Sequence, residues 1–476
     1  MSRATAKRSS PRFGTSGWRG VWGEEFTLPR FRTVLRGSAA WFAENGGGEV
    51  VLVHDTRFLG ERLAQQAHAL LAEAGLSVCR GRGASPTPVA VRAVLRRRAA
   101  GAVVLTASHN PPEYQGVKVF GPDGAGVAGS EVRRIEALVA RARDEEPPPS
   151  APVRSRELRS AYVRELLREL DLAAFERARP RVVYDALHGA GAGVLDAVLE
   201  EAGARVETLR AAPDPHFGGV VPDPTAATLL GLRRRVGTLR GARLGIATDG
   251  DADRFAVVDE RGRLLSATQA LALLVEHCAR SGRASRGVAL SIATGSLAEK
   301  VAREHGLAVS RHPIGFKHFR AALLAGRADL AGEESGGFAW GRFHPDKDGV
   351  LAASLLTESL ARGRAPLSER LARLERRHGR SCCGRVALAL APGQLDAFEK
   401  LRAAPPARLD GARVLAMRDD DGLHLALADG FVMLRPSGTE PLLRVYAEAP
   451  GRAALERRLG AGAAALGVLG GSLVSR

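Results

Sequence analysis

A serine in a short polar segment is the first residue of this chain whose surroundings suggest covalent chemistry. The segment Thr106–Pro112 reads Thr-Ala-Ser-His-Asn-Pro-Pro, and it follows the apolar run Ala102–Leu105, which predicts a short buried strand. The two prolines exclude helix, because each lacks an N–H and restricts the residue before it. Ser108 is therefore expected on a rigid loop at a strand end, with His109 beside it and Lys118 ten residues further on. An ordinary turn would be the simplest interpretation if three other loops did not carry matching chemistry.

A second loop places three carboxylates at alternate positions. Asp249, Asp251 and Asp253 lie between two expected strands, and alternation in an extended chain directs all three side chains to one side. Three hard oxygen ligands so close together repel one another unless a divalent cation lies among them, and Mg²⁺ is the natural candidate. A calcium-binding EF-hand is excluded, because Arg254 stands where that loop needs glycine and strands flank the segment.

Two further loops carry groups suited to a phosphate and a sugar. The segment Arg435–Pro441 offers a guanidinium, two hydroxyls and N–H groups exposed by glycine, which are the donors that bind a phosphate dianion. It is not a Walker A loop, because no lysine follows the glycine. The segment Gly332–Gly337 places Glu333, Glu334 and Ser335 between glycines, where the carboxylates can accept hydrogen bonds from vicinal sugar hydroxyls. A hairpin turn and a surface acidic turn are the simpler alternatives for these two segments.

Two glycine-rich segments have weaker implications. Phe13–Gly20 contains three glycines and two hydroxyl residues, and Arg19 is its only charge, so its backbone N–H groups suit an anion. His188–Gly193 follows the expected strand Arg181–Asp185 and resembles a dinucleotide-binding turn. The G-x-G-x-x-G spacing is not met there, so a tight strand-to-helix turn is the prediction. Together, the acceptor serine, the metal loop, the hydroxyl-binding loop and the phosphate loop indicate phosphoryl transfer on a phosphosugar.

The charge balance favours anionic small molecules. The formal net charge is +17, but only six of the 69 basic residues are lysines, and the arginines are spread over the whole chain. No aromatic RNA-binding motif or zinc-finger spacing accompanies them, so we expect no nucleic-acid partner. Three of the six lysines, Lys118, Lys317 and Lys347, lie in or beside the loops above. Their retention in an arginine-rich chain suggests that these positions need a compact ammonium.

Cysteine usage and the two ends of the chain favour a cytoplasmic protein that does not enter a membrane. The four cysteines have neither metal-ligand spacing nor disulfide density. Met1–Arg12 is basic and polar without an apolar stretch, so no signal peptide is expected. Leu459–Ser475 is rich in glycine and alanine and is shorter than the ~20 apolar residues of a membrane span. A packed terminal helix and strand is the prediction for that segment.

Length and pattern predict several domains. A chain of 476 residues is too long for one core, and alternating strand and helix signals predict mostly parallel sheets covered by helices. The acidic, proline-rich segment Asp144–Pro152 is the clearest linker, and helical sequence is expected from Leu351 to Arg376. The final hundred residues have short strands and predict a smaller α+β domain. The expected boundaries are 1–150 with the serine loop, 151–258 with the metal loop, 259–378 with the sugar loop and 379–476 with the phosphate loop.

The four loops, in this order, resemble those of the α-D-phosphohexomutase superfamily, most closely the bacterial phosphoglucomutase/phosphomannomutase branch. The similarity runs from Phe13 to Tyr446, and the segments Pro213–Gly219 and Val221–Pro224 also resemble a family segment. The resemblance implies four domains around a central cleft. Three of them share a mixed α/β architecture, and the smaller α+β domain at the C-terminus moves to close on substrate.

The resemblance also implies a mechanism. Ser108 would carry a phosphoryl group, and Mg²⁺ would be held by that phosphoserine with Asp249, Asp251 and Asp253. Transfer to a hexose 1-phosphate would give a hexose 1,6-bisphosphate, which turns over in the cleft, returns its other phosphoryl group and also serves as activator. Arg19, His109, Lys118 and Arg254 would line the reacting end. The substrate would be held by Lys317, Glu333, Glu334, Ser335, Arg435, Ser437, Gly438 and Thr439. The general base is Lys118 or, second, His109.

The resembling segments rank the sugars. Glu333-Glu334-Ser335 with Pro313–Lys317 is more similar to glucose-selective members than to dual-specificity enzymes, which often have methionine at the second carboxylate, or to phosphoglucosamine mutases, which usually have glutamine there. We therefore expect glucose phosphates first, mannose phosphates second and glucosamine phosphate third. The non-enzyme alternative is a degenerate relative that binds phosphosugars or polyanions. A monomer or a homodimer is expected.

Overall fold

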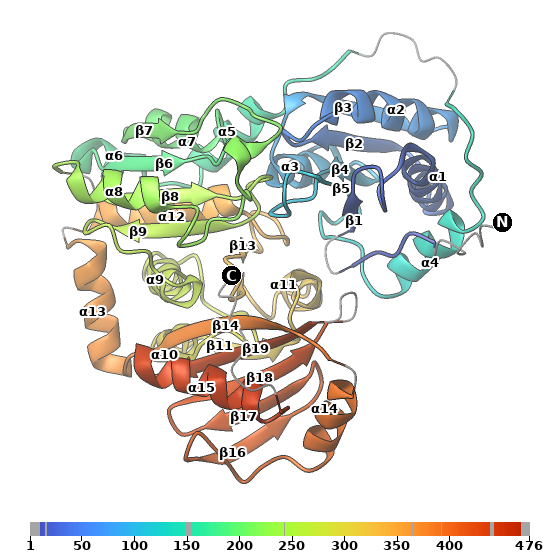
Figure 1. Cartoon of the computed structure of the whole chain (residues 1–476). Helices are drawn as coiled ribbons and strands as arrows, with labels where there is room; N and C mark the ends of the chain where they lie inside the picture. Colours follow the sequence, from blue (N-terminus) through green and yellow to red (C-terminus); the bar gives the residue numbers. More distant parts are fainter. Residues whose placement is uncertain are drawn as a thin grey trace.

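Four β-sheets, each with its own helices, make up the molecule. The computed structural model describes residues 10–14, 17–147, 154–241, 243–363, 365–391, 393–437 and 442–467. In Figure 1 the first sheet is blue, the second green, the third yellow to orange and the fourth red, so the sheets follow one another along the chain. This is the predicted architecture, three α/β domains followed by a C-terminal domain built on an antiparallel sheet.

The first sheet has the order β1-β5-β4-β2-β3. Strands β2, β3 and β4 are parallel, and β5 runs antiparallel between β1 and β4. The strands are β1 (Trp18–Val21), β2 (Glu49–His54), β3 (Ser77–Ala84), β4 (Gly101–Leu105) and β5 (Tyr114–Phe120). The helices are α1 (Leu28–Glu44), α2 (Gly60–Glu73), α3 (Thr87–Arg97) and α4 (Ser130–Val139). Strand β4 is buried throughout, which explains its uninterrupted apolar sequence.

The second sheet has the order β7-β6-β8-β9, with β9 antiparallel to β8. Its strands are β6 (Arg181–Asp185), β7 (Arg205–Leu209), β8 (Leu244–Thr248) and β9 (Phe255–Asp259). Its helices are α5 (Arg159–Leu167), α6 (Leu172–Ala178), α7 (Leu195–Ala202) and α8 (Leu230–Thr238), with a short 3-10 turn η1 (Phe217–Gly219). The glycine-rich segment after β6 forms a tight turn before α7, as expected.

The third sheet has the order β11-β10-β12-β13 and again ends in an antiparallel strand. Its strands are β10 (Gly287–Ser291), β11 (Ala308–His312), β12 (Leu330–Gly332) and β13 (Phe338–Trp340). The helical elements are α9 (Ala267–Arg280), α10 (Ser296–Glu304), η2 (Phe316–His318), α11 (Arg320–Leu324), α12 (Gly349–Arg362) and α13 (Leu367–His378). The helical sequence expected over 351–376 is confirmed and forms two helices. Pro366 cannot continue a helix, so α12 ends before it and α13 begins directly after it.

The fourth sheet is antiparallel throughout, with the order β14-β19-β18-β17-β16-β15. Its strands are β14 (Cys382–Ala389), β15 (Arg408–Leu409), β16 (Ala412–Arg418), β17 (Leu423–Leu427), β18 (Gly430–Pro436) and β19 (Leu442–Ala449). Its helices are α14 (Gln394–Ala403) and α15 (Arg452–Ala464). The expected terminal helix is α15, whereas a strand expected beyond it lies outside the described residues.

The cores show how the domains are joined. One continuous cluster of buried apolar side chains spans the first three domains and includes Val104, Phe175 and Leu271. The fourth domain has a separate core, and a small cluster that includes Ile292 and Tyr446 joins it to the third. The fourth domain is therefore attached through much less apolar surface than the other three. Within the described residues no helix is both long and apolar enough to cross a membrane.

Candidate active site

Ser108 lies in a loop that begins at the end of β4, and its side chain is buried. Its backbone has a φ of 52°, which is left-handed and unusual for a serine. The Ser108 N–H donates to Thr106 Oγ1 at 2.8 Å, and its Oγ donates to Asp249 Oδ2 at 2.7 Å. A strained, fully hydrogen-bonded conformation of this kind persists only where the surrounding structure holds it. The serine is thus fixed with its hydroxyl facing the carboxylates of the second domain.

Arg57 holds the serine loop in place, and sequence reasoning missed it. Its guanidinium donates to four carbonyl oxygens of the loop, those of Ser108 (2.7 Å), Asn110 (2.6 Å), Pro111 (2.6 Å) and Tyr114 (2.9 Å). Its Nε donates to Asp55 Oδ2 at 3.2 Å, and the same oxygen accepts a hydrogen bond from Thr106 Oγ1. The side chain of Arg57 is fully buried. One arginine therefore organises the segment on which Ser108 depends.

Burial shifts the pKa values of both Arg57 and its partner Asp55. It raises the pKa of the Asp55 carboxyl, although Arg57 and the Thr106 hydroxyl act in the opposite direction. It lowers the pKa of Arg57, against the attraction of Asp55 and Asp251. The one sequence signal for the pair is its position. Asp55 follows β2 directly, at the carboxyl edge of a parallel pair with β4, where functional side chains of α/β sheets gather.

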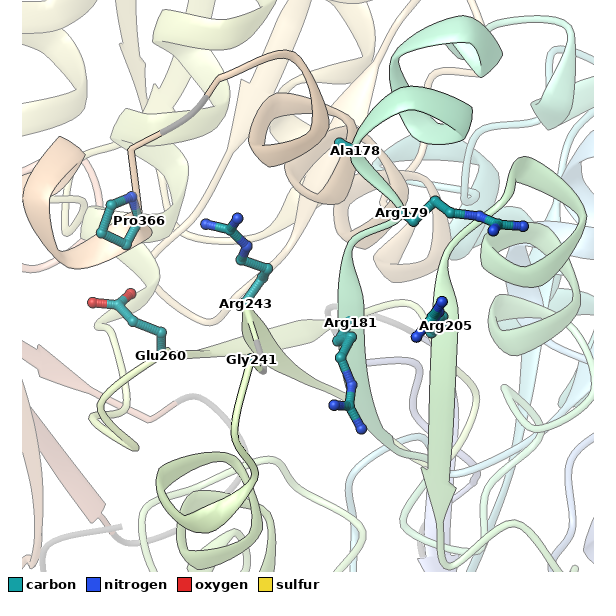
Figure 2. Close-up of a pocket in the computed structure, with 8 residues that line it drawn as sticks. All are labelled: Ala178, Arg179, Arg181, Arg205, Gly241, Arg243, Glu260 and Pro366. Carbon is teal, nitrogen blue, oxygen red and sulfur yellow. The ribbon is translucent and has the colours of Figure 1, made fainter.

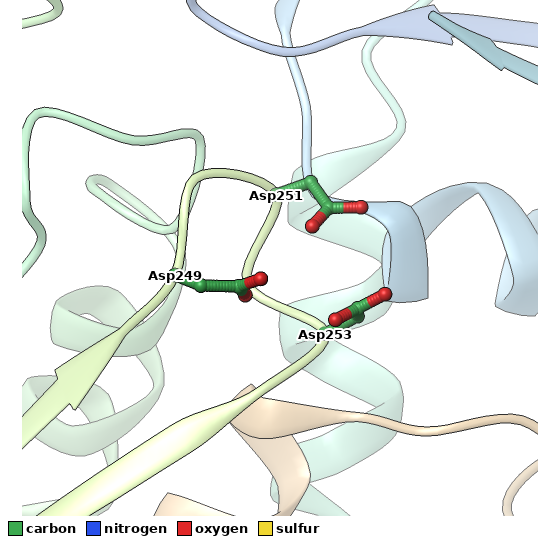
Figure 3. A group of neighbouring side chains, drawn as sticks. All are labelled: Asp249, Asp251 and Asp253. Atoms are coloured by element: carbon green, nitrogen blue, oxygen red, sulfur yellow. The ribbon is translucent and has the colours of Figure 1, made fainter. Parts of the chain in front are cut away.

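The three aspartates lie on a turn between β8 and β9 (Figure 3). The expectation of an extended segment was wrong. Ala252 has a φ of 56°, and its N–H donates to the carbonyl of Asp249 at 3.0 Å. The turn directs the three carboxylates to one side, and one oxygen from each lies within 4.8 Å of the others. A Cβ at Gly250 would stand 2.7 Å from the carbonyl oxygen of Ser108, so glycine permits the two loops to touch.

The electrostatics of this cluster fit a divalent cation. Burial, with Asp253 and Asp251 nearby, raises the pKa of Asp249 well above its usual range. Burial also acts to raise the pKa of Asp253, but Lys118 and Lys347 outweigh it and the pKa falls. Within the described residues, the buried Oδ1 atoms of Asp251 and Asp253 have no hydrogen-bond partner. Unpartnered hard oxygens on crowded carboxylates are the donor set that Mg²⁺ prefers.

Removing divalent cations is expected to abolish turnover, and adding Mg²⁺ is expected to restore it. Asp251→Asn removes one of three charges from the cluster, so the Mg²⁺ concentration for half-maximal activity should rise about tenfold or more. A second readout is thermal unfolding, in which Mg²⁺ should raise the melting temperature of the wild type more than that of the variant.

Asp419→Asn is the matched control, because Asp419 is an exposed residue of another acidic run, in the fourth domain. Its response to Mg²⁺ should equal that of the wild type. Full activity in a chelator, or an Asp251→Asn variant with unchanged Mg²⁺ dependence, would contradict the assignment.

Basic side chains surround the serine and the aspartates. Lys118, on β5, donates to Asp253 Oδ2 at 2.6 Å and also to Asp251 Oδ2. Burial acts to lower the pKa of Lys118, but the two aspartates outweigh it and the pKa is raised. Lys347 Nζ lies 3.1 Å from Asp253 Oδ2, and Lys347 is one of the three lysines that the sequence singled out as retained beside the functional loops. The cluster is thus enclosed by ammonium groups.

Arg19, His109 and Arg254 complete the basic wall. Arg19 donates to the Asn110 side chain at 2.5 Å, and burial lowers its pKa. His109 Nδ1 lies 3.4 Å from Ser108 Oγ, and burial together with Arg254 and Arg19 lowers its pKa well below the usual value. The backbone N–H of Arg254 donates to Asp249 Oδ1 at 3.0 Å, and its side-chain Nε is buried without a partner among the described residues. A wall of this composition suits an anion that enters beside the serine.

The sugar loop lies between β12 and β13 and touches the metal loop. The N–H of Phe255 donates to the carbonyl of Gly336 at 3.2 Å, which joins the two loops directly. Ser335 Oγ donates to Glu333 Oε1 at 2.6 Å, and Glu334 accepts a hydrogen bond from Ser291. Burial and the neighbouring Glu333 raise the pKa of Glu334.

Lys317 belongs to the same region of the structure. It lies in η2 and lines a small cavity together with Lys118, Asp253 and Lys347. The structure therefore brings Lys317 beside Asp253 and joins the sugar loop to the segment that carries the aspartates.

The phosphate loop lies at the junction of the third and fourth domains. Arg435, at the end of β18, donates to Asp421 Oδ1 at 2.8 Å, and Asp421 Oδ2 accepts from the N–H of Ile314 at 2.7 Å. The N–H of Ser437 donates to the carbonyl of Leu442 at 2.7 Å. Gly438 and Thr439 lie outside the described residues.

A cavity of about 470 Å³ separates the sugar loop from the fourth domain. The third domain contributes Glu334 and Ser335 to its lining, and the fourth contributes Arg385 and Tyr446. The proximity of Glu334 helps burial to raise the pKa of Tyr446 to about 12. Sequence reasoning missed Arg385 and Tyr446, because nothing distinguishes one arginine among many and Tyr446 lies on a strand that was not predicted.

A buried serine bonded to one of three clustered carboxylates and enclosed by cations is an arrangement suited to phosphoryl transfer. Comparison with known proteins agrees with that class. The chain matches the phosphoglucomutase/phosphomannomutase alpha/beta/alpha domain I over residues 10–146, domain II over 160–262, domain III over 266–377 and the C-terminal domain over 386–462. The chain belongs to this family, within the α-D-phosphohexomutase superfamily, and membership indicates a mutase that transfers phosphoryl groups.

The names of the individual relatives differ in the sugar that they give. The phosphoglucomutase/phosphomannomutase of Thermococcus kodakarensis is 32% identical over 445 residues, which are 92% of this chain and 94% of the relative. The phosphoglucosamine mutase of Desulforudis audaxviator is 31% identical over 445 residues, 92% and 93% of the two chains. The crystal structure of a phosphoglucomutase/phosphomannomutase family protein from Burkholderia thailandensis is 28% identical, with a TM-score of 0.81 over 95% of this chain and 96% of that chain.

Proposed function

We propose that this chain interconverts glucose 1-phosphate and glucose 6-phosphate through a phosphoserine on Ser108 and a glucose 1,6-bisphosphate intermediate. One observation carries the proposal. Ser108 has a left-handed backbone, and its buried hydroxyl is held 2.7 Å from Asp249 inside a basic wall, which suits a group that gives and receives a phosphoryl group.

Both halves of the reaction use the same serine. In the first half the Oγ–phosphorus bond of Ser108 breaks as the 6-hydroxyl of glucose 1-phosphate bonds to phosphorus, and the hydroxyl proton passes to a basic side chain. After the bisphosphate turns over, its 1-phosphoryl group bonds to Ser108 Oγ and a proton returns to the sugar oxygen. Lys118 and His109 are the two candidates for the proton acceptor. Because glucose 1,6-bisphosphate can exchange between the cleft and the solvent, added bisphosphate is expected to act as an activator.

The residues of the cleft divide the remaining work. Asp249, Asp251 and Asp253 would hold Mg²⁺ with the phosphoserine, and the ion supplies positive charge to the phosphoryl oxygens. Arg19 and Arg254 stabilise charge at the reacting phosphate because their guanidiniums are already fixed and desolvated. Glu333, Glu334, Ser335 and Lys317 would bind the sugar hydroxyls. Arg435, Ser437, Gly438 and Thr439 would bind the phosphate that is not reacting.

The choice of glucose rests on Glu333 and Glu334. Both carboxylates stand at the sugar loop, and Ser335 and Ser291 hold them in place. Ordered acceptors of this kind favour a hexose with a hydroxyl at carbon 2 over glucosamine. Glucose is placed before mannose because Glu333-Glu334-Ser335 with Pro313–Lys317 resembles the glucose-selective members. Mannose phosphates are the second candidate, because relatives with both sugars in their names match most of the chain. Glucosamine phosphate is the third candidate and is supported by the relatives named as phosphoglucosamine mutases.

A parallel assay of three sugar 1-phosphates tests the assignment. Purified protein with Mg²⁺ and a trace of glucose 1,6-bisphosphate should convert glucose 1-phosphate with the highest kcat/KM. Mannose 1-phosphate and glucosamine 1-phosphate are expected to be slower by about tenfold or more, the discrimination that one misplaced hydroxyl contact can provide. A higher kcat/KM with either of the other sugar phosphates would make that compound the preferred substrate. No turnover with any of the three would refute the proposal of a hexose phosphate mutase.

A further inference from the structure

Arg385, on β14, extends from the face of the fourth sheet that meets the third domain. A Cβ at Gly384 would stand 3.1 Å from Leu455 on α15, so Gly384 faces the core of the fourth domain. Cys383 faces the opposite way, because its Sγ would collide with a Cβ at Gly295 of the third domain. Successive side chains of a strand alternate between its two faces, so Arg385 lies on the same side as Cys383.

Two more arginines lie on this face of the sheet. Arg385 is the register partner of Tyr446 on β19. Arg444 lies two residues before Tyr446, and its register partner is Arg435 on β18. Directly opposite residues of antiparallel strands share a face, so the three arginines begin on the same side. Burial and Glu334 raise the pKa of Tyr446, and the three guanidiniums act in the opposite direction. A band of positive charge therefore runs from the phosphate loop at Arg435 to Arg385.

Arg385 lies near both the serine loop and the sugar loop. Burial is the main cause of the lowered pKa of His109, and the charge of Arg385 adds to the effect. Burial raises the pKa of Glu334, and Arg385 acts against that change. Arg385 also lines the cavity of about 470 Å³ beside the sugar loop. This guanidinium of the fourth domain thus lies between the serine that reacts and the loop assigned to the other phosphate.

The two carboxylates of the described cavity lining have other partners. Glu334 accepts a hydrogen bond from Ser291, and Asp223 lies 4.0 Å from Arg254. The guanidinium of Arg385 forms no hydrogen bond or ion pair with another residue in the part of the chain that the structure describes. It is therefore available to pair with an anion in the cleft, where a guanidinium matches phosphate oxygens with paired donors.

The turnover of a bisphosphate gives this guanidinium a role. A hexose bisphosphate carries about twice the charge of a monophosphate, since each phosphate monoester contributes about −1.5 to −2 at pH 7. While the bisphosphate reorients, both phosphates leave the groups that hold them at the serine and at the phosphate loop. We propose that Arg385 binds a phosphate group of the bisphosphate between the two half-reactions and keeps the intermediate in the cleft. Such a residue is needed only if the reaction passes through a free bisphosphate, so this assignment rests on the proposed function.

Ligand binding by protein that cannot turn over tests the assignment. Calorimetric titration of the full chain with glucose 1,6-bisphosphate compares Ser108→Ala with Ser108→Ala/Arg385→Gln. The double variant should bind the bisphosphate about tenfold more weakly, whereas its affinity for glucose 6-phosphate should change by less than about threefold. Ser108→Ala/Arg385→Lys should recover most of the affinity for the bisphosphate, because lysine retains the charge and also binds phosphate.

Arg243→Gln, in the same Ser108→Ala background, is the matched control. Arg243 is exposed and also lines a cavity, but that cavity lies outside the cleft, where Arg181 and Arg205 line it as well (Figure 2). The Kd for the bisphosphate should stay within about twofold, because an exposed charge outside the cleft is largely screened by salt. A loss equal to that caused by Arg385→Gln would show that only net charge matters and would overturn the proposal.

Retention of the intermediate is the functional readout. Phosphoenzyme that carries a radiolabelled phosphoryl group is mixed with unlabelled glucose 1-phosphate, and the labelled bisphosphate that escapes into solution is counted. Arg385→Gln should raise the escaping fraction per turnover about tenfold, because most of a loss in affinity appears as faster dissociation. An Arg385→Gln variant that binds and retains the bisphosphate as the wild type does would overturn the role of Arg385 and leave the proposed function standing. A wild type that forms no labelled bisphosphate would refute the proposed function and the role of Arg385 with it.

Discussion

Replacing Ser108 with alanine is expected to reduce kcat for glucose 1-phosphate by at least about 10³-fold, because the variant lacks the oxygen that accepts and returns the phosphoryl group. Added glucose 1,6-bisphosphate should not restore turnover, since it rephosphorylates an enzyme only where the hydroxyl is present. The structure predicts a modest effect on stability. Asp249 Oδ2 loses the hydrogen bond from Ser108, but Asp249 Oδ1 keeps the one from the Arg254 N–H. Steady-state kinetics and urea unfolding measure the two effects separately.

Ser38→Ala is the matched control for that experiment. Ser38 is also fully buried, and its hydroxyl donates to the carbonyl of Val34 at 2.8 Å within α1, away from the cleft. Both variants therefore lose one buried hydroxyl, but only one should lose turnover. If Ser108→Ala keeps a kcat within about tenfold of the wild type, the phosphoryl group does not pass through this serine.

The parts of the site that could be predicted from the sequence are short motifs of neighbouring residues. The serine loop was found because Pro111 and Pro112 follow a buried strand, and the metal loop because Asp249, Asp251 and Asp253 are close in sequence. Even there the conformation was misjudged, since the positive φ of Ala252 makes a turn from a segment expected to be extended. Residue type and spacing could predict the chemistry, because three crowded carboxylates need a cation in either conformation.

The residues that escaped prediction act across long separations. Arg57 binds the carbonyl oxygen of Ser108, which is 51 positions away in the chain. Because every residue has a carbonyl oxygen, residue types do not predict such a contact. Arg385 and Tyr446 reach the cavity at the sugar loop only because the fourth domain packs against the third. Local motifs predicted the reacting groups, whereas the groups that position them required the packed structure.

The positioning role of Arg57 leads to the second large expected effect. Arg57→Lys keeps a positive charge beside Asp55 but replaces a five-donor guanidinium with a compact ammonium that cannot reach four carbonyls at once. The loop should then lose its fixed geometry, and kcat should fall about 10²-fold because the serine oxygen no longer stays in line with the incoming phosphate. The KM for glucose 1-phosphate should change little, since the substrate-binding side chains are untouched.

Arg57→Ala should show the thermodynamic side of the same interaction, because it leaves the buried carboxylate of Asp55 without its cation. Removal of one partner of a buried pair costs about 3–5 kcal/mol of unfolding free energy, so urea unfolding should reveal a larger loss than for Arg57→Lys. Arg92→Lys is the control: Arg92 also bonds to a carboxylate and a backbone carbonyl, but these belong to Glu165 and Phe343 of the second and third domains, and it lies 4.6 Å from the Phe343 ring. It should lower stability without lowering kcat. A wild-type kcat in Arg57→Lys, or an equal loss of kcat in Arg92→Lys, would show that the geometry of the serine loop does not depend on this guanidinium.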